Sequence, residues 1–227
     1  MALQMVIGNK NYSSWSMRPW VLMTQLDIPF HELKLRFDFD DDSAFRKAVA
    51  RVSPAGFVPV LVDDGFSVWD TLAIAEYLHE KFPERGVWPA EAKQRARARS
   101  LAAEMHAGFA ALRSHCPMNI EARLPEVGAR IWAEQEAVQR NVARIEAAWA
   151  DALETSGGPF LFGRFGAVDA FFAPVCMRLA SYGLPVSAAA QAYVDRVSAV
   201  PGVARWVAEA LAEKDFLDFE EPYRKAR

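Results

Sequence analysis

The chain has 227 residues, 52% of them hydrophobic, which is enough for a substantial core and for one or two domains. Its 26 basic and 29 acidic residues leave a formal net charge of −3, which excludes a strong overall attraction to nucleic acid or to an anionic membrane, and we expect neither as a partner. The two cysteines, Cys116 and Cys176, form no CxxC or CxxH pattern and no secretory leader or membrane-spanning run is found, so we expect no disulfide framework, no metal and a cytoplasmic location.

The first third of the chain alternates short strand and helix patterns. Residues 3–8 are an apolar run typical of a buried strand, and residues 18–30 have helical apolar spacing that ends at a proline. Apolar and charged residues alternate in residues 31–37, which predicts a strand with one buried face. After a short helix, residues 58–69 contain two β-rich runs joined by an Asp-Gly turn, and residues 71–82 have a helical pattern. The predicted order is β-α-β-α-β-β-α.

A segment rich in proline and glycine, at residues 83–89, separates this part from the rest of the chain. We therefore predict a first domain at residues 1–82 and a second, all-helical domain at residues 90–227. The second domain is expected to contain one long helix at about residues 91–115, another at about residues 125–153, and three shorter helices.

Three serines, Ser13, Ser14 and Ser16, cluster at the start of the first helix. Because proline lacks an amide hydrogen and is comfortable only in a helix's first turn, Pro19 predicts a helix start between Ser14 and Arg18. Serines in this position usually cap the helix, and capping accounts for one or two of the three. A remaining hydroxyl at the positive end of the helix can donate to an anion such as a thiolate.

A second feature lies at Val58 and Pro59, where a strand begins. A proline there is tolerated at a sheet edge, at the first position of a strand or in a cis turn. A cis Val58-Pro59 bond would leave the backbone amide and carbonyl of Val58 free to pair with an extended peptide. An ordinary edge-strand proline is the alternative.

The third feature is Asp70 and Thr71, one of which stands at the expected N-cap of the last helix of the first domain. The amino end of that helix would attract a carboxylate, although capping alone also explains the two residues. Together the three features predict a groove that offers a hydroxyl to a sulfur, a backbone edge to a peptide and a helix start to a carboxylate.

These segments resemble the cytosolic glutathione transferase superfamily, whose members join a thioredoxin-like α/β domain to an all-α domain. GFVPVLVDDGFSVWDTLAIAEYL, at residues 56–78, is similar to that family's VP-L-(D)G-(E/Q)S-AI--YL segment. FLFGRFGAVDAFFAPV, at residues 160–175, is similar to its second-domain G--(S/T)-AD----P segment, with Gly166 at the capping Ser/Thr position. The resemblance covers nearly the whole chain and implies this two-domain fold.

The resemblance also implies which hydroxyl faces the thiol. Serine-type and cysteine-type members place the thiol-facing residue five positions before an arginine of the first helix, and Ser13 stands five before Arg18. Ser13 is therefore the first catalytic candidate, Ser14 the second and Tyr12 the third. The pattern is similar to the zeta-like SSC(S)WR of a bacterial, serine-type member, except that Trp15 replaces the cysteine.

Glutathione is the cosubstrate that the resemblance implies. Val58, followed by Pro59, would pair with its cysteinyl backbone, and Asp70 and Thr71 would hold its γ-glutamyl end. The Ser13 hydroxyl would lower the pKa of the thiol, and the thiolate would then attack a small electrophile bound against the helical domain. Family members are typically dimers, so a homodimer is implied as well.

The electrophile side of the cleft has its own candidates. His106, Phe109 and Arg113 recur at i, i+3 and i+7 of the predicted long helix, and with Trp15 they would form the substrate-binding wall. The alternative is that these side chains pack between the two domains.

The predicted function is that of a glutathione S-transferase that acts in detoxification. Two alternatives stay open: a noncatalytic binding or scaffold protein of the same fold, and a glutathione-dependent isomerase of the maleylacetoacetate type. Against the isomerase, polar residues of the zeta-like pattern are replaced by Ala110, Ser114 and Cys116. A glutaredoxin-like disulfide exchanger is disfavoured because no cysteine stands at the first helix start.

Overall fold

A computed structural model describes residues 3–227, and the order β-α-β-α-β-β-α is confirmed in its first part. The elements of this part are β1 (Leu3–Ile7), α1 (Ser14–Gln25), β2 (Phe30–Lys34), α2 (Ala44–Ala50), β3 (Val60–Asp63), β4 (Phe66–Val68) and α3 (Thr71–Lys81). The strands form one mixed sheet in the order β2-β1-β3-β4. β1 runs parallel to β2 and antiparallel to β3, which in turn pairs antiparallel with β4. This is the expected thioredoxin-like arrangement.

The β3–β4 connection is the predicted Asp-Gly hairpin. Asp64 and Gly65 have φ values of 50° and 83°, and two consecutive positive φ angles are what a two-residue type I′ turn requires. The prediction that the strand at residues 31–37 has one buried face is wrong in part, because Leu33 is 39% exposed and Leu35, just after β2, is only half-buried. The physical reason is that β2 is an edge strand, with β1 on one side only.

The second part of the chain is helical, as expected, but both predicted long helices are broken. Its elements are the 3₁₀ turn η1 (Pro83–Arg85), then α4 (Ala92–Ala107), α5 (Ala110–His115), α6 (Pro125–Glu134), α7 (Glu136–Ser156), α8 (Ala167–Tyr182), α9 (Ala188–Ala199), α10 (Pro201–Glu213) and the 3₁₀ turn η2 (Asp218–Glu220). Phe109 has a left-handed φ of 55°, which cannot continue α4, and Gln135 leaves the helical region between α6 and α7.

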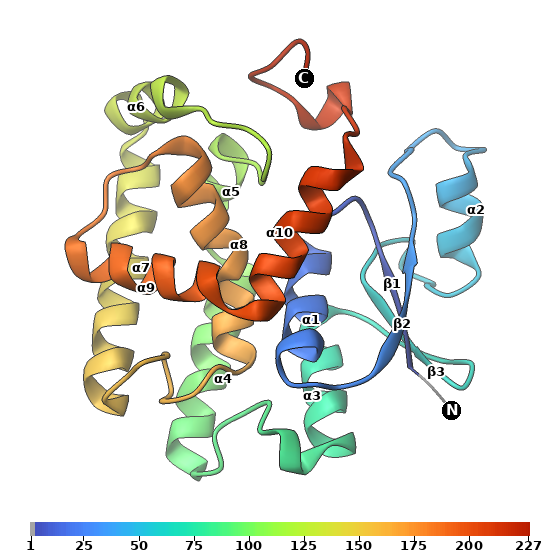
Figure 1. The fold of residues 1–227 in the computed structure, drawn as a ribbon, viewed down its shortest axis with the longest axis horizontal. Helices are drawn as coiled ribbons and strands as arrows, with labels where there is room; N and C mark the ends of the chain where they lie inside the picture. The colour runs from blue at the N-terminus through green and yellow to red at the C-terminus, as the bar shows by residue number, and fades with distance from the viewer. Residues whose placement is uncertain (1–2) are drawn as a thin grey trace.

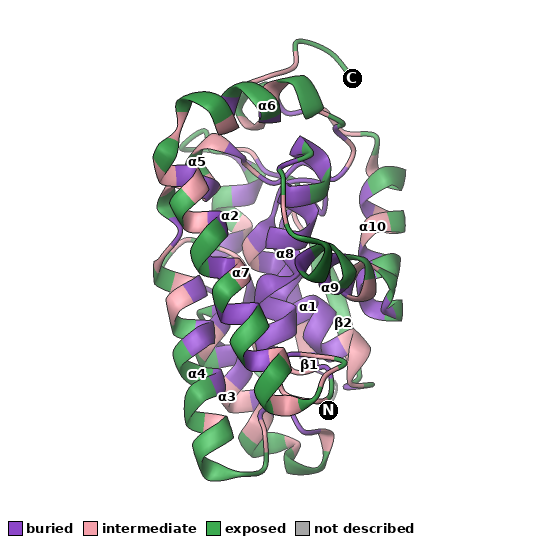
Figure 2. Cartoon of the chain, turned by 90° about the vertical axis from the view of Figure 1, so that its left-hand side faces the viewer, coloured by how far each residue is buried: buried purple, intermediate pink, exposed green. Residues whose placement is uncertain are grey.

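Helix α1 joins the two parts of the molecule. It lies between the sheet and the helical part, where it packs against α8 and α10 (Figure 1). Helix α8 is buried over almost its whole length, at the centre of the molecule (Figure 2). This explains why its sequence is nearly all apolar rather than amphipathic. The packing places the amino end of α1 directly against the helical part.

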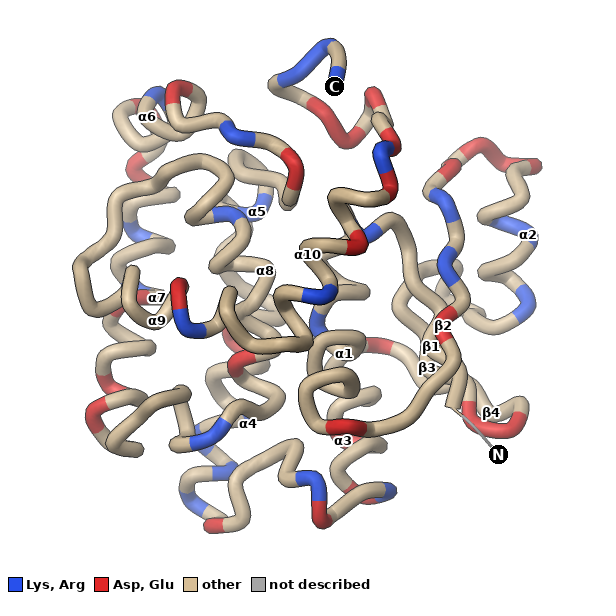
Figure 3. The backbone as a smooth tube through the Cα atoms, in the orientation of Figure 1, with Lys and Arg blue, Asp and Glu red and all other residues tan. Residues whose placement is uncertain are grey.

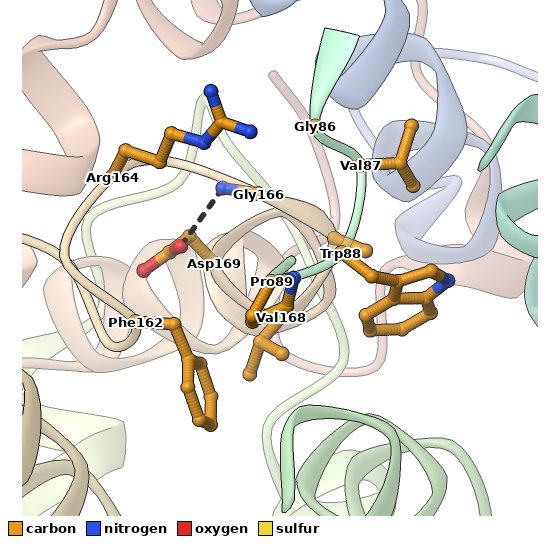
Figure 4. A pocket seen from close by; sticks show the side chains of 10 residues that line it. Gly86, Val87, Trp88, Pro89, Phe162, Arg164, Gly166, Val168 and Asp169 are labelled. Carbon is orange, nitrogen blue, oxygen red and sulfur yellow. Dashed lines mark hydrogen bonds between the residues drawn. The ribbon is translucent and has the colours of Figure 1, made fainter. Parts of the chain in front are cut away.

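The start of α8 depends on one buried carboxylate. Asp169 accepts from the backbone amide of Gly166 at 3.0 Å (Figure 4). It also accepts from the amide of Leu161 at 3.1 Å and from the Tyr193 hydroxyl at 2.8 Å. Burial raises the pKa of Asp169 to about 6, against the lowering effect of these donors. Gly166 is the N-cap, as the resemblance implied, so a helix can begin there without a capping hydroxyl. The adjoining cavity of about 20 Å³ has no room for a ligand larger than a water molecule.

Basic and acidic positions are interspersed along both parts of the chain (Figure 3). Acidic residues at and just after the carboxyl end of α10 pair with basic residues at and just after the end of β2: Lys34 bonds to Glu213 at 3.0 Å and Arg36 to Asp215 at 2.8 Å. Among residues 3–227, none of the helices has both the length and the apolar composition needed to span a bilayer.

Candidate active site

The first serine of the cluster caps helix α1. The Ser13 hydroxyl accepts from the amide of Ser16 at 3.4 Å and donates to the Ser16 hydroxyl at 2.7 Å. Ser16 is fully buried, and its hydroxyl also accepts from the Gly8 amide at 3.2 Å. Two of the three serines therefore hold the β1–α1 connection, as the capping interpretation predicted. Pro19 lies beyond the first turn, inside α1, so the helix begins at the early end of the predicted interval.

Ser14 has a different environment. Its hydroxyl oxygen accepts from Nη2 of the buried Arg178 at 3.1 Å, and within residues 3–227 its own hydrogen has no acceptor. Tyr12 is engaged elsewhere, since its hydroxyl donates to Glu221 at 2.7 Å. Burial, followed by this hydrogen bond, raises the pKa of Tyr12 to about 12, so its hydroxyl stays protonated. Of these three hydroxyls, that of Ser14 is the one left free to donate.

The backbone at Val58 is arranged as the cis-turn interpretation required. The Val58-Pro59 bond is cis, and Pro59 is buried immediately before β3. The amide and carbonyl of Val58 form no hydrogen bond with the described part of the chain, and its side chain is half-buried. An extended peptide could therefore pair with this edge.

Asp70 is the N-cap of α3, and its Oδ1 accepts from the Leu72 amide at 3.0 Å. Its other oxygen, Oδ2, lies 3.3 Å from Nε2 of His106, while Nδ1 of His106 lies 3.4 Å from the Thr71 hydroxyl. Burial lowers the pKa of His106, and the Asp70 carboxylate opposes this effect. The imidazole therefore orients both residues of the predicted carboxylate-binding helix start.

Two adjoining hollows bring these groups together. The Asp70 hollow, of about 490 Å³, is lined by Trp15, Ala55, Phe57, Val58, Pro59, Trp69, Asp70, Thr71 and His106. The Ser14 hollow, of about 300 Å³, is lined by Tyr12, Ser13, Ser14, Trp15, Phe37, Phe39, Phe45, Phe57, Val58, Arg113, Pro117, Met118, Arg178 and Glu220. Trp15, Phe57 and Val58 line both hollows, so a ligand can extend from the Asp70 side chain to the Ser14 hydroxyl.

Most of the predicted site residues line these hollows, and Phe109 does not. Phe109 is buried in the main hydrophobic core, because the break between α4 and α5 turns it away from the face that carries His106 and Arg113. The prediction that Phe109 belongs to the substrate-binding wall, together with His106 and Arg113, is therefore wrong. Sequence reasoning also missed Arg178, although a single arginine within an apolar helix was a usable signal.

Two arginines lie against the Trp15 ring, and a third, Arg178, lines the Ser14 hollow. The guanidinium carbons of Arg18 and Arg113 lie 4.1 and 5.7 Å from the centre of the Trp15 ring. Arg178 donates to the carbonyls of Cys116 and Pro174 as well as to Ser14. Burial, reinforced by the neighbouring arginines, lowers the pKa of Arg18 to about 9 and that of Arg178 to about 10. Both groups are therefore still cationic at neutral pH.

Comparison with known proteins identifies the family. Residues 12–81 match the model of the glutathione S-transferase N-terminal domain, and residues 132–209 match that of the C-terminal domain. Dichloromethane dehalogenase of Methylorubrum extorquens is 40% identical over 68 residues, which are 29% of this chain and 23% of the dehalogenase. Glutathione S-transferase 1 of Dianthus caryophyllus is 28% identical over 140 residues, which are 60% of this chain and 61% of that protein. The chain thus spans less than two thirds of each of these relatives.

Solved structures match over a longer range. A Burkholderia glutathione transferase homologue with bound glutathione is 25% identical, with a TM-score of 0.68, over 93% of this chain and 99% of that one. The Tau class enzyme of mango, Mangifera indica, has a TM-score of 0.70 at 19% identity, over 93% and 96% of the two chains, which shows the shared fold. From the two domain matches and this fold, the chain belongs to the cytosolic glutathione transferase superfamily.

Proposed function

We propose that this chain is an enzyme that binds glutathione and activates its thiol for attack on a small electrophile. The observation that carries the proposal is the Ser14 hydroxyl, which accepts from Arg178 at 3.1 Å and has a hydrogen free to donate into the hollow. A hydroxyl that accepts from a cation is a stronger donor, because the two bonds polarise each other. Relatives named glutathione S-transferase support the proposal.

Glutathione would lie across both hollows. The free backbone groups of Val58 would pair with its cysteinyl residue, as a short added strand. At the γ-glutamyl end, Oδ2 of Asp70 would accept from the ammonium group, and the amino end of α3 at Thr71 would receive the carboxylate. The sulfur would then reach the Ser14 hollow at the amino end of α1.

Thiol activation follows from this placement. The Ser14 hydroxyl would donate to the sulfur, and the positive end of α1 would add to the effect, so the thiol pKa would fall. Each pKa unit corresponds to about 1.4 kcal/mol of preferential stabilisation of the thiolate. The thiol proton would leave to water, and the thiolate would form a C–S bond with the electrophile as the leaving group departs with its electron pair. Ser13 remains the alternative donor, if its hydroxyl turns away from Ser16.

The test is a calorimetric titration of glutathione into the purified protein, together with thiolate absorbance followed across pH. We expect one site per chain and a bound thiol pKa at least about one unit below that of free glutathione. Absence of binding would overturn the proposal and favour the noncatalytic scaffold function. Binding with an unshifted thiol pKa would leave a glutathione-binding protein without thiol activation.

A further inference from the structure

The cations beside Ser14 form no salt bridge within the described part of the chain, although the charge of Asp70 lies near enough to act on Arg18. Within residues 3–227, no carboxylate lies within salt-bridge distance of Arg18, Arg113 or Arg178, whose hydrogen bonds go to neutral oxygens. Arg18 is only 1% exposed, and its Nε and Nη1 atoms have no hydrogen-bond partner among residues 3–227. Nε of Arg113 is likewise buried and unpartnered. Buried charges are ordinarily paired, because an isolated one loses its hydration without compensation.

The position of these cations points to the hollow as the place for the missing anion. Arg113 and Arg178 line the Ser14 hollow, and Arg18 stacks on Trp15, which forms part of its wall. One acidic side chain, Glu220, lines the same hollow. Two cations, Arg113 and Arg178, line the hollow together with one carboxylate, Glu220, and Arg18 adds a further positive charge against Trp15. Because this excess of positive charge is small, the hollow favours a ligand with a single negative charge over one with several.

The rest of the lining defines the body of the ligand. Trp15, Pro117 and Met118 give the hollow an apolar wall next to the arginines, and the exposed Phe57 stands between this hollow and the Asp70 hollow. A volume of about 300 Å³ suits a compact molecule rather than a long chain. Planar guanidinium groups match the two oxygens of a carboxylate.

We propose that the electrophile is a compact, largely apolar monocarboxylate, with its carboxylate held by Arg113 and Arg178 beside the Ser14 hydroxyl. This inference rests on the proposed function and names its class of substrate. The carboxylate takes no part in bond changes: the thiolate of glutathione attacks an electrophilic carbon elsewhere in the molecule, the C–S bond forms, and the leaving group departs as its anion.

A matched pair of electrophiles tests the proposal. Glutathione displaces chloride from 4-chloro-3-nitrobenzoate and from its methyl ester, and each enzymatic rate is divided by the uncatalysed rate with the same compound. We expect the parent protein to prefer the acid. Arg113→Gln should lower the acid-to-ester ratio of kcat/KM by about tenfold or more, the range expected for a charge-assisted hydrogen bond. Arg113→Lys should restore part of the ratio.

An exposed arginine that does not line the hollow provides the control. Arg140→Gln removes an exposed charge on α7, paired with Glu136, and should leave the ratio unchanged. Melting temperatures of all variants report on folding. If Arg113→Gln fails to fold, the acid-to-ester ratios of kcat/KM for the parent protein and for Arg113→Lys still show whether the site prefers a carboxylate. Equal use of acid and ester by the parent would overturn the proposal.

Binding without turnover separates this inference from the proposed function. Calorimetry measures the affinity for 4-chloro-3-nitrobenzoate and for the ester, with and without S-methylglutathione, which cannot react. Tighter binding of the acid that depends on Arg113, without turnover of either compound, would support the carboxylate site and overturn the transferase function. Binding of neither compound under either condition would overturn the carboxylate site. A loss of glutathione affinity in Arg113→Gln as large as the loss for the acid would assign the arginines to the cosubstrate.

Discussion

Three neighbouring hydroxyls differ in what their surroundings leave them free to do. Tyr12 is bonded to Glu221, and Ser13 is bonded to Ser16 as the cap of α1. Ser14 accepts from Arg178 but donates to no group within residues 3–227. The family resemblance implies Ser13 as the catalytic residue, through its position five before Arg18, whereas the hydrogen bonds favour Ser14. Substitution can separate these two assignments.

Ser14→Ala is expected to raise the pKa of the bound glutathione thiol by about one unit or more, because the donor to the sulfur is lost. The kcat should fall about 10- to 100-fold, while the KM for glutathione changes little, since the peptide contacts at Val58 remain. Thiolate absorbance across pH and steady-state kinetics measure the two effects.

Ser13→Ala provides the comparison for that experiment. It removes an N-cap, so the free energy of unfolding should fall by about 1 kcal/mol, with a smaller effect on the thiol pKa. Ser100→Ala, at an exposed position of α4, should change neither quantity. If Ser13→Ala abolished the shift of the thiol pKa and Ser14→Ala preserved it, the catalytic assignment would return to Ser13.

At the scale of elements, the buried carboxylate of Glu221 is one of the groups that join the C-terminal segment to the rest of the chain. Glu221 is buried and accepts from the Tyr12 hydroxyl at 2.7 Å and from Nδ2 of Asn119 at 2.8 Å, and it also pairs with Arg224. Burial alone would raise the pKa of Glu221, but the donors, Arg224 foremost, outweigh it and lower the pKa below 4.5. The same segment carries Glu220, so it forms part of the Ser14 hollow.

Acid should therefore loosen this segment. A carboxylate whose pKa is lower in the folded state stabilises that state above its unfolded pKa, and the contribution is lost as the pH falls through the folded pKa. We expect Glu221→Gln to reduce the free energy of unfolding by about 1.5–3 kcal/mol near neutral pH. The difference between parent and variant should shrink as the pH falls below 4.5.

Urea unfolding over a range of pH measures this difference directly. Asp41→Asn, at an exposed position outside the helices, is the matched control and should follow the parent throughout. A difference between parent and Glu221→Gln that stays constant into acid would show that the charge of Glu221 does not stabilise the docked segment.

At the scale of the molecule, α1 connects the first part of the chain, which contains the sheet, to the helical part. Its packing on α8 and α10 brings Arg178 of α8 to Ser14 of α1, and α5 contributes Arg113 to the same hollow. The candidate site thus requires both domains. The edge strand β4 presents Phe66, which does not line the site, at 62% exposure, and the exposed Trp69, which lines the Asp70 hollow, follows just after it. An exposed apolar side chain on an edge strand is a favourable contact for a second chain.

We expect a homodimer that includes this surface. Sedimentation should give twice the chain mass of 25.3 kDa at micromolar concentration, and Phe66→Glu should shift the distribution toward the monomer, because it places charge in an apolar contact. Leu211→Glu, at an exposed position of α10, should leave the mass unchanged. A strictly monomeric parent protein would contradict the expectation.

Much of the fold could be read from local patterns along the chain. The order of strands and helices in the first part followed from apolar periodicity, and the β3–β4 hairpin from its Asp-Gly turn. The break at Phe109 had a local signal that was missed, since the C-cap of α4 just before it is Gly108, whereas glutamine at position 135 does not interrupt a helix by its own chemistry. The backbone there follows packing between elements far apart in sequence, which periodicity does not record.

The sequence by itself determined the chemical groups of the candidate site, because a hydroxyl cluster, a Val-Pro strand start and an Asp-Thr cap are local features. Only the tertiary structure decided how these groups are used. It occupied the Ser13 hydroxyl with a cap, and, as far as residues 3–227 show, it left the Ser14 hydrogen without an acceptor and brought Arg113 and Arg178 to the same hollow without a salt bridge. Hydrogen-bond partners and unpaired charge depend on contacts between α1, α5 and α8, and such contacts exist only after the chain has folded.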